Sequence, residues 1–322
     1  MTSLAELRRR AEDGDAHALT MLGRRLLTGQ GVTPAPRDGI ACIERAAALG
    51  DGEATALLAL FEAWGVLRAR DVSSALDRLQ RAAELGWTAA QHELRFLARS
   101  DGEDWASLRA RVDVAAWTAP TKVRVLTESP GIRVSEGFAT PAECAWLIEL
   151  GRPGLRPALI YRKDAIGHVA SASRTNTESD YTIARADIVL NLVRARLAGT
   201  AGVESRYFEV AKLLHYEPGQ RFEPHCDFQE PTTPALEQEV ARHGQRVATA
   251  LLYLNDDYEG GETDFPRIGL QYRGARGDLL MFDNVRPSGA LDYDTLHAGL
   301  PPTRGVKWLY SQWIRDRPVS QA

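Results

Sequence analysis

Two short stretches of the chain place a histidine and a carboxylate two residues apart. One is FEPHCDF, which holds His225 and Asp227, and the other is LHYEPG, which holds His215 and Glu217. In a β-strand, residues i and i+2 point to the same face, so either pair could offer two ligands to one metal ion. A chain with seven histidines and 43 acidic residues also produces such spacings by chance. Neither pair identifies a metal site on its own.

The two pairs differ in their sequence context. A proline and a glycine end the strand that carries His215, whereas Pro224 directly precedes His225. Proline is tolerated at the first residue of a strand, so we expect His225 to start a strand near a rim, where a site can open. This context favours His225 and Asp227 as metal ligands and a structural role for His215.

A third ligand and a cation follow later in the chain. The stretch DTLHAGLPPTRGVKW contains His297 and, ten residues on, Lys307. Two histidines and one carboxylate can hold Fe(II) on one face and leave positions open for a co-substrate and O₂. The intervening turn residues predict a hairpin that places Lys307 on the strand next to His297. Only four of the 39 basic residues are lysines, so a lysine here favours a compact charge for the far carboxylate of a dicarboxylate co-substrate.

The elements that would position these residues are mostly strands. From about residue 120 the apolar residues alternate, and residues 140–151 read as a helix with Thr140 as N-cap and Pro141 at its first position. Four runs have strand composition with Gly, Pro, Asp and Asn between them: RYFEVAKLLHYEPG, RVATALLYLND, GDLLMFDN and GVKWLYSQWIRD. Many strands beside one helix-rich flank indicate a jelly roll or a closed barrel.

The first hundred residues repeat with a period of 36. Gly14, Gly50 and Gly86 are spaced by this interval, and ERAAALGDGEA (44–54) aligns with QRAAELGWTAA (80–90). A repeat of this length is typical of stacked helical pairs, which bury their apolar faces only against their neighbours. The glycines suit helix C-termini, where a positive φ costs glycine nothing.

We expect two full helical units and one trailing helix at about 88–99. A plain helical bundle is the alternative interpretation. Either way, this half shows no convergent set of catalytic side chains, so a docking surface or a spacer is the expected role.

Composition and charge restrict the class of protein. An apolar fraction of 44% and a charged fraction of 25% are typical of soluble globular proteins. The net charge of −4 argues against a general nucleic-acid or membrane-surface binder, and no apolar run is long enough to span a bilayer. The N-terminus lacks the features of a secretory signal. Cys42, Cys144 and Cys226 are far apart and odd in number, which indicates a reducing cytoplasmic location.

Several long stretches also carry a family resemblance. They are LLHYEPGQRFEPHCDF, GQRVATALLYLNDDYEGGETDFP, GDLLMFDNVRPSGALDYDTLHAGLPPTRGVKWLYSQWI and, more weakly, SRTNTES. Through them, residues 125–322 resemble the prolyl 4-hydroxylase branch of the Fe(II)/2-oxoglutarate dioxygenases. Through LGRRLLTGQGV and AAALGDGEA, about residues 5–100 resemble Sel1-like repeats, relatives of the tetratricopeptide class.

The resemblance implies an α+β multidomain chain. Its parts are an N-terminal α-helical Sel1-like solenoid (1–100), a connector helix (101–119) and a C-terminal double-stranded β-helix, or jelly roll, oxygenase domain (120–322). It implies His225, Asp227 and His297 as iron ligands. Lys307 would bind the C5 carboxylate of 2-oxoglutarate, and Tyr216 would hydrogen-bond the same co-substrate. Tyr216 as a core tyrosine is the plainer interpretation.

The resemblance also implies residues on the substrate side. Arg246 and Trp313 match positions that line the peptide groove in the family, and Arg174 matches the start of a mobile substrate-covering loop over about 162–180. The plainer interpretations are an ion pair for Arg246 and core packing for Trp313. Two departures concern Cys226, which replaces a common tyrosine, and the segment 229–245, whose distinct composition puts the lid and the substrate in doubt.

The expected reaction is hydroxylation of prolyl residues in a protein or peptide, with conversion of 2-oxoglutarate and O₂ to succinate and CO₂. Fe(II) is the expected metal, and ascorbate is a further candidate cofactor. The helical repeats are expected to dock the protein substrate, and neither nucleic acid nor membrane is expected as a partner. Two alternatives remain open: the same chemistry on another side chain or a free amino acid, and a repeat scaffold with a degenerate oxygenase domain.

Overall fold

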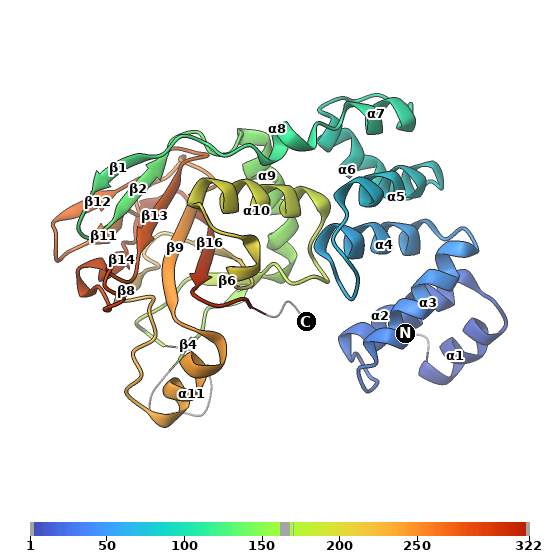
Figure 1. Cartoon of the computed structure of the whole chain (residues 1–322), viewed down its shortest axis with the longest axis horizontal. Helices are drawn as coiled ribbons and strands as arrows, with labels where there is room; N and C mark the ends of the chain where they lie inside the picture. The colour runs from blue at the N-terminus through green and yellow to red at the C-terminus, as the bar shows by residue number, and fades with distance from the viewer. Residues whose placement is uncertain (1–2, 162–167, 170, 320–322) are drawn as a thin grey trace. The chain divides into compact units, whose positions relative to one another are not determined.

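The computed structural model describes residues 3–161, 168–169 and 171–319. The chain divides into two compact units (Figure 1). The first, here called the helical unit, runs to Trp117 and includes Ala186–Leu192; the second, the strand unit, holds the rest of the chain from Thr118 onward. Among the described residues, no helix combines the length and apolarity that a bilayer crossing requires.

Helices account for the regular structure of residues 3–118. They are α1 (Leu4–Glu12), α2 (Ala16–Thr28), α3 (Pro36–Ala48), α4 (Gly52–Trp64), α5 (Val72–Glu84), α6 (Thr88–Ala98), α7 (Trp105–Arg111) and α8 (Val114–Thr118). Gly14, Gly50 and Gly86 have φ of +85°, +87° and +85°, and a helix begins two residues after each. The intervals between these glycines hold two helices each, and α6 trails them, as the 36-residue period predicts.

Two features set the geometry of these helices. The Asp15 and Asp51 side chains cap α2 and α4 by accepting hydrogen bonds from the backbone N–H of Ala18 and Ala54, whereas Trp87 stands in that place before α6 and makes no such bond. The helices α2 and α3 cross closely at Gly23 and Gly39. A Cβ on Gly23 would lie 2.7 Å from the carbonyl oxygen of Gly39.

Replacing Gly23 with alanine is expected to destabilise the protein. Alanine at an exposed mid-helix position gains about 1 kcal/mol in helix propensity over glycine, but overpacking costs about 1–3 kcal/mol, so the clash at the crossing should dominate. Urea unfolding would measure the change. Gly102→Ala is the matched control, since its Cβ would lie 3.5 Å from its nearest neighbour. A Gly23→Ala protein as stable as the control would show that the crossing tolerates a methyl group.

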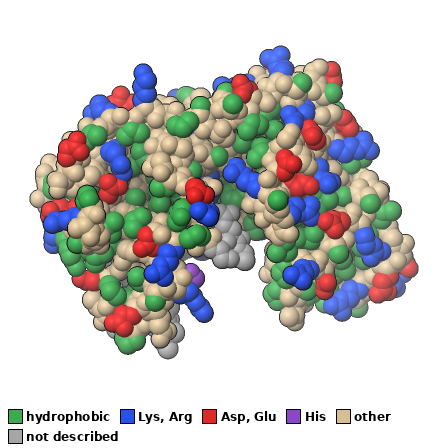
Figure 2. Space-filling view, viewed as in Figure 1, with side chains coloured by type: hydrophobic (Ala, Val, Ile, Leu, Met, Phe, Trp, Pro, Cys, Tyr) green, Lys and Arg blue, Asp and Glu red, His purple; other side chains and the backbone are tan. Residues whose placement is uncertain are grey.

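Charged side chains of both signs are interspersed over the face shown in Figure 2. Elsewhere in the chain, ion pairs at helical spacing join residues such as Arg9 with Glu6 (2.8 Å) and Arg81 with Glu84 (3.2 Å). The net charge of the chain is therefore not gathered into one large patch on this face.

Antiparallel strands form two sheets in the strand unit. The major sheet has the order β1-β2-β13-β9-β16-β7-β6-β3, and the minor sheet has the order β12-β11-β14-β8. The strands of the major sheet are β1 (Arg124–Thr127), β2 (Ile132–Ser135), β3 (Arg156–Pro157), β6 (Thr177–Asp180), β7 (Lys212–Tyr216), β9 (Arg246–Tyr253), β13 (Leu279–Asp283) and β16 (Lys307–Arg315). Those of the minor sheet are β8 (Phe222–His225), β11 (Thr263–Phe265), β12 (Leu270–Tyr272) and β14 (His297–Gly299).

The remaining elements are short strand pairs, helices and 3₁₀ turns. The pairs are β4 (Ile160–Tyr161) with β5 (His168–Val169), and β10 (Glu259–Gly260) with β15 (Pro302–Arg304). The helices are α9 (Pro141–Gly151), α10 (Ile188–Ala201) and α11 (Pro234–His243), and the turns cover Arg152–Gly154, Ser205–Tyr207 and Tyr293–Thr295. The predicted start of α9 is confirmed: Thr140 caps it and forms a capping box with Glu143.

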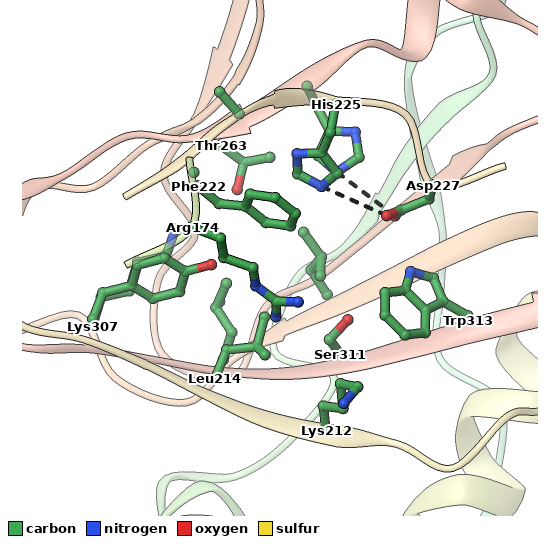
Figure 3. A pocket seen from close by; sticks show the side chains of 16 residues that line it. Arg174, Lys212, Leu214, Phe222, His225, Asp227, Thr263, Lys307, Ser311 and Trp313 are labelled. Carbon is green, nitrogen blue, oxygen red and sulfur yellow. Dashed lines mark ion pairs between the residues drawn. The ribbon is translucent and has the colours of Figure 1, made fainter. Parts of the chain in front are cut away.

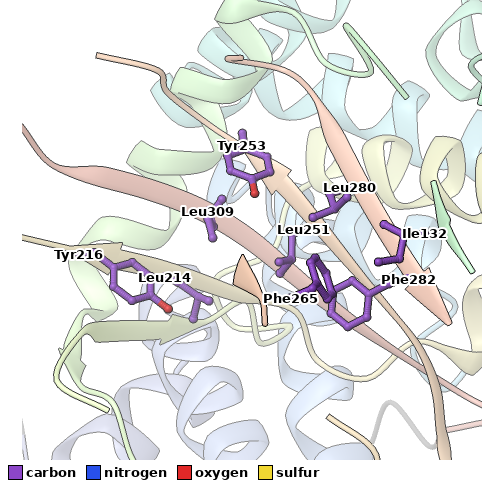
Figure 4. Close-up of a cluster of buried hydrophobic side chains, with 9 residues drawn as sticks. All are labelled: Ile132, Leu214, Tyr216, Leu251, Tyr253, Phe265, Leu280, Phe282 and Leu309. Atoms are coloured by element: carbon purple, nitrogen blue, oxygen red, sulfur yellow. The ribbon is translucent and has the colours of Figure 1, made fainter. Parts of the chain in front are cut away.

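Side chains of both sheets meet in one apolar core (Figure 4). Phe265 of β11 packs edge-on against Phe282 of β13, with ring centroids 5.3 Å apart. The hydroxyls of Tyr253 in β9 and Thr263 in β11 share a hydrogen bond of 2.7 Å. Two facing sheets with a filled interior are the architecture of a jelly roll, so the predicted fold class is confirmed.

The predicted hairpin between His297 and Lys307 is wrong. The strand β14 of His297 lies between β11 and β8 in the minor sheet, whereas β16 of Lys307 lies between β9 and β7 in the major sheet. The chain crosses between the sheets through β15, which pairs with β10. Residues Pro302–Arg304 form a strand of their own between β14 and β16, so the chain makes a crossing and not a tight turn.

Two further expectations need correction. His225 is the last residue of β8, not its first, and Pro224 lies within this edge strand. In the stretch predicted as a mobile loop over 162–180, residues 177–180 form β6 and pair with β7, because this segment completes the major sheet. Residues 162–167 and 170 of that stretch lie outside the described residues.

Candidate active site

Three potential metal ligands converge between the sheets. His225 ends β8, Asp227 follows at a bend, and His297 begins β14 directly opposite His225 in the β8–β14 ladder. One ligand atom from each residue lies within 4.8 Å of the other two. The Nε2 atoms of His225 and His297 are each 3.6 Å from an oxygen of Asp227 (Figure 3). The structure thus brings together the three residues that the sequence predicts.

Backbone carbonyls orient both imidazoles. Nδ1 of His225 lies 2.8 Å from the carbonyl oxygen of Glu223, and Nδ1 of His297 lies 3.0 Å from that of Thr295. A carbonyl only accepts, so each Nδ1 carries the proton and each Nε2 presents its lone pair toward Asp227. This is the arrangement by which outer hydrogen bonds orient histidine ligands.

The Asp227 carboxylate is held by a chain of two further residues. Its Oδ2 accepts a hydrogen bond of 2.6 Å from the Thr249 hydroxyl, which accepts one of 3.0 Å from the Asn284 side-chain amide. Thr249 and Asn284 are almost fully buried. Sequence reasoning missed both, although Thr249 lies in the RVATALLYLND run.

Electrostatics favour metal-binding protonation states. Burial and the neighbouring His297 charge lower the pKa of His225 to about 3, so its imidazole is neutral near pH 7. Burial alone would raise the pKa of Asp227, but its interactions with His297 and His225 and the Thr249 hydrogen bond lower it. His225 therefore offers a neutral nitrogen, and Asp227 offers a charged oxygen.

A buried cation lies at the far end of the same pocket. Lys307 is 1% exposed, and its ammonium donates a hydrogen bond of 2.6 Å to the carbonyl oxygen of Gly261. Burial lowers the pKa of Lys307 to about 7, against a smaller opposing effect of Glu262. Among the described residues no carboxylate forms an ion pair with it. A buried ammonium without a carboxylate partner is suited to binding an anionic ligand.

Tyr216 accompanies Lys307. The two residues are direct partners in the β7–β16 ladder, and the ammonium lies 5.6 Å from the centroid of the Tyr216 ring. Burial raises the pKa of Tyr216 to about 12, so its hydroxyl keeps its proton and can donate a hydrogen bond. Both residues line the pocket of the metal triad.

Arg174 lines this pocket too, but its charge is already compensated. Its guanidinium is buried and forms an ion pair of 2.7 Å with Glu178. It also lies 4.6 Å from the ring centroid of Phe222, which stacks on His225 at 3.5 Å. Arg174 therefore contacts Phe222, the ring that stacks on the metal ligand His225 (Figure 3).

Of the two other predicted substrate residues, only Trp313 lines the pocket. Arg246 makes two hydrogen bonds to the Glu209 carboxylate, of 2.6 and 2.9 Å, and stacks 3.7 Å from the centroid of Trp313. The ion pair left open as an alternative for Arg246 is therefore present. The buried indole nitrogen of Trp313 has no hydrogen-bond partner among the described residues.

His215 lies away from the pocket. Its Nδ1 is 3.0 Å from the Thr177 hydroxyl, and its ring packs against Trp308 with centroids 4.2 Å apart. Its strand neighbours, Leu214 and Tyr216, line the pocket on the opposite face of β7. The alternation along β7 thus separates the second histidine–carboxylate pair from the metal triad.

Lys212 is a pocket residue that sequence reasoning missed. It shares a strand face with Leu214 and Tyr216, so the period of two contained the signal. Its ammonium contacts Glu178 (3.0 Å) and Asp180 (2.8 Å).

Comparison with known proteins agrees with this geometry. Residues 211–315 match the 2OG-Fe(II) oxygenase superfamily model. The chain is 29% identical over 248 residues to "Probable prolyl 4-hydroxylase 7" of Arabidopsis thaliana, covering 71% of this chain and 77% of the relative. It is 31% identical over 242 residues to "Probable prolyl 4-hydroxylase 3" of the same plant, covering 69% of this chain and 79% of the relative.

Solved structures show similarity to each half. The viral collagen prolyl hydroxylase of Paramecium Bursaria Chlorella virus-1 is 26% identical, covers 57% of this chain and 95% of its own, and has a TM-score of 0.44. A Sel1 repeat protein from Oxalobacter formigenes is 28% identical, covers 33% of this chain and 87% of its own, and has a TM-score of 0.29.

The family match covers all three residues of the metal triad, and relatives above 30% identity extend over more than two thirds of both chains. The chain therefore belongs to the 2OG-Fe(II) oxygenase superfamily, as a member of its prolyl 4-hydroxylase family.

Proposed function

We propose that the protein hydroxylates prolyl residues of a protein or peptide, using Fe(II), 2-oxoglutarate and O₂. The observation that carries the proposal is the shared pocket of a two-histidine, one-aspartate cluster and a buried lysine without a carboxylate partner among the described residues. The general reaction follows from the family. The prolyl substrate rests on the relatives, which are prolyl 4-hydroxylases.

The donor set fits Fe(II). Two neutral imidazole nitrogens and one carboxylate oxygen form the facial triad of non-haem Fe(II) oxygenases. His225, Asp227 and His297 would hold the metal. When bound, the iron supplies the oxidising chemistry, in which 2-oxoglutarate is converted to succinate and CO₂ and one oxygen atom enters a C–H bond of the substrate.

The residues of this chain would position the reactants. Lys307 would bind the far carboxylate of 2-oxoglutarate, and the protonated Tyr216 hydroxyl would donate a hydrogen bond to it. On the substrate side, Trp313 would contact the peptide, and Arg246 would fix the indole by stacking on it. Arg174 would keep Phe222 against His225 and so maintain the orientation of that ligand.

The domain roles are part of the same proposal. The helical repeats of about 1–100 would dock the protein substrate, residues 101–119 would connect, and residues 120–322 would be catalytic. All three cysteines are unpaired, which supports a reducing, cytoplasmic setting. Ascorbate would serve as an accessory reductant.

The direct test measures two products of the same reaction. Fe(II)-loaded protein is incubated with 2-oxoglutarate and proline-containing peptides, and succinate is measured together with a mass gain of one oxygen on the peptide. Both are expected in equal amounts. Succinate without peptide oxidation would reject the prolyl substrate, and the absence of both products with every peptide would favour the repeat-scaffold alternative.

Thr249→Val is expected to weaken Fe(II) binding by about 10–100-fold, as other outer-shell substitutions do. Valine keeps the shape of threonine but removes the hydrogen bond to Asp227 and the acceptor for Asn284. Titration of the apoprotein with Fe(II) without oxygen would measure the change. Thr55→Val, at a buried threonine of the helical unit, is the control. Equal affinity of the two variants would contradict a positioning role for Thr249.

The affinity for 2-oxoglutarate is expected to fall as the pH rises above about 7. Burial lowers the pKa of Lys307 to about 7, so the unliganded protein loses the ammonium proton above this pH, and a carboxylate must restore it on binding. The expected loss is up to about tenfold per pH unit. Calorimetry in buffers of different ionisation enthalpy would show proton uptake. Lys307→Arg should remove the pH dependence, because guanidinium stays charged.

A further inference from the structure

The inner face of the major sheet carries its polar side chains at two separate ends. At one end, Tyr216 and Lys307 are ladder partners, and at the other end Lys212 pairs with Ser311. Leu214 and Leu309, also ladder partners, lie between them and are buried. Tyr216 lies four residue steps along β7 from Lys212, which corresponds to about 13 Å. One pocket therefore has two cationic ends with an apolar middle.

The Lys212 end is on the substrate side of the pocket. If Lys307 and Tyr216 hold 2-oxoglutarate, the opposite end is left for the molecule that is hydroxylated. Trp313, the next inward residue of β16 after Ser311, also lines this end. Figure 3 shows Lys212, Ser311 and Trp313 on one side of the pocket, apart from Lys307.

This end offers hydrogen-bond donors. Lys212 uses two of its three ammonium hydrogens on Glu178 and Asp180, which leaves one. The Trp313 indole N–H is buried without a partner among the described residues. That nitrogen has almost no accessible surface, so Trp313 contributes its ring to this end and Lys212 supplies the charged donor. Ser311 adds a hydroxyl to the same wall.

The charges around Lys212 favour an anion. Glu178 bridges Lys212 and Arg174, and Asp180 bridges Lys212 and Arg156. Burial alone would raise the pKa of Asp180, but Lys212 and Arg156 lower it, so this carboxylate is ionised at neutral pH. Three cations thus face two carboxylates, which leaves one positive charge uncompensated within this network.

We infer that Lys212, Ser311 and Trp313 form a substrate subsite for a carboxylate that lies beside the hydroxylated residue. The carboxylate would come from an acidic side chain or from a chain terminus; both have the same chemistry. The inference rests on the proposed function, because it assumes that Lys307 binds the co-substrate. It adds a substrate preference to the proposed function: the substrate carries a negative charge beside the residue that is hydroxylated.

The test measures peptide binding without turnover. Full-length protein with Fe(II) and 2-oxoglutarate is titrated under nitrogen with four proline peptides that carry Glu or Gln beside the proline and end in a free carboxylate or an amide. A carboxylate is expected to tighten binding by about tenfold or more, as hydrogen bonds to charged groups do. Comparison of the four peptides shows whether the side chain or the terminus supplies it.

Two variants assign the effect to the subsite. Lys212→Gln should abolish the preference for the carboxylate, and Lys122→Gln, at an exposed lysine outside the pocket, should keep it. Ser311→Ala leaves the Glu178 and Asp180 contacts in place, and it should reduce the preference severalfold even if Lys212→Gln does not fold.

Three results would overturn the inference. They are equal binding of all four peptides, no binding of any peptide, and an unchanged preference in folded Lys212→Gln and Ser311→Ala proteins. The inference and the proposed function fail separately. Carboxylate-dependent binding without peptide oxidation in air would reject prolyl hydroxylation and leave the subsite standing.

Discussion

His297→Ala is expected to abolish iron-dependent turnover of 2-oxoglutarate and to lower Fe(II) affinity by more than about 100-fold, since even outer-shell substitutions cost 10–100-fold. His297 is one of three ligands and lies directly opposite His225, so neither remaining residue can replace it. Succinate formation and anaerobic Fe(II) titration measure the two effects.

His215→Ala is the matched control for this variant. It also removes an imidazole from the strand unit, but one that contacts Thr177 and Trp308 on the other face of β7. We expect it to lose some stability and to keep measurable turnover. Activity in His297→Ala together with none in a folded His215→Ala protein would move the metal site to the second pair.

Lys307→Met is expected to have two opposite effects. Loss of the charged hydrogen bond to a carboxylate should raise the 2-oxoglutarate concentration needed for half-maximal turnover by about 10–100-fold. The unliganded protein should become more stable by roughly 1–3 kcal/mol, because a buried ammonium is replaced by an apolar chain of similar length. Succinate kinetics and urea unfolding measure these separately.

Succinate kinetics and urea unfolding together distinguish a co-substrate-binding role of Lys307 from a purely structural role. A merely structural lysine would lower stability when replaced and leave the co-substrate requirement unchanged. Lys212→Met provides the comparison, because Lys212 is partly exposed and already paired with two carboxylates, so its loss should not stabilise the protein. An unchanged requirement in Lys307→Met would contradict the assigned role.

The sequence was sufficient for two of the ligands because their spacing is local. His225 and Asp227 are two residues apart, and the bend after β8 keeps them together even though Asp227 lies outside the strand. The jelly roll and the 36-residue helical period were predictable for a similar reason. Apolar alternation and recurrent glycines reflect burial and turns within short windows of chain.

Contacts between distant segments were not predictable in this way. The period of two does not say which sheet a strand joins, so the sequence predicts a hairpin where the chain crosses from His297 to Lys307. The partners of Arg246 and Lys212 lie 37 and 32 or more residues away along the chain. The helix α10 is buried over much of its surface, from Ile188 to Val193, and therefore lacks a clear amphipathic pattern.

The crossing between the sheets has a consequence for the choice of co-substrate. Backbone hydrogen bonds hold its first part, from Leu300 to Glu262 (2.9 Å) and from Gly219 to Pro302 (2.9 Å). It joins the last metal ligand to the buried ammonium, but the pairing of β14 and β16 in their own sheets fixes the span between them. Dicarboxylic acids one carbon shorter or longer than 2-oxoglutarate should therefore bind poorly.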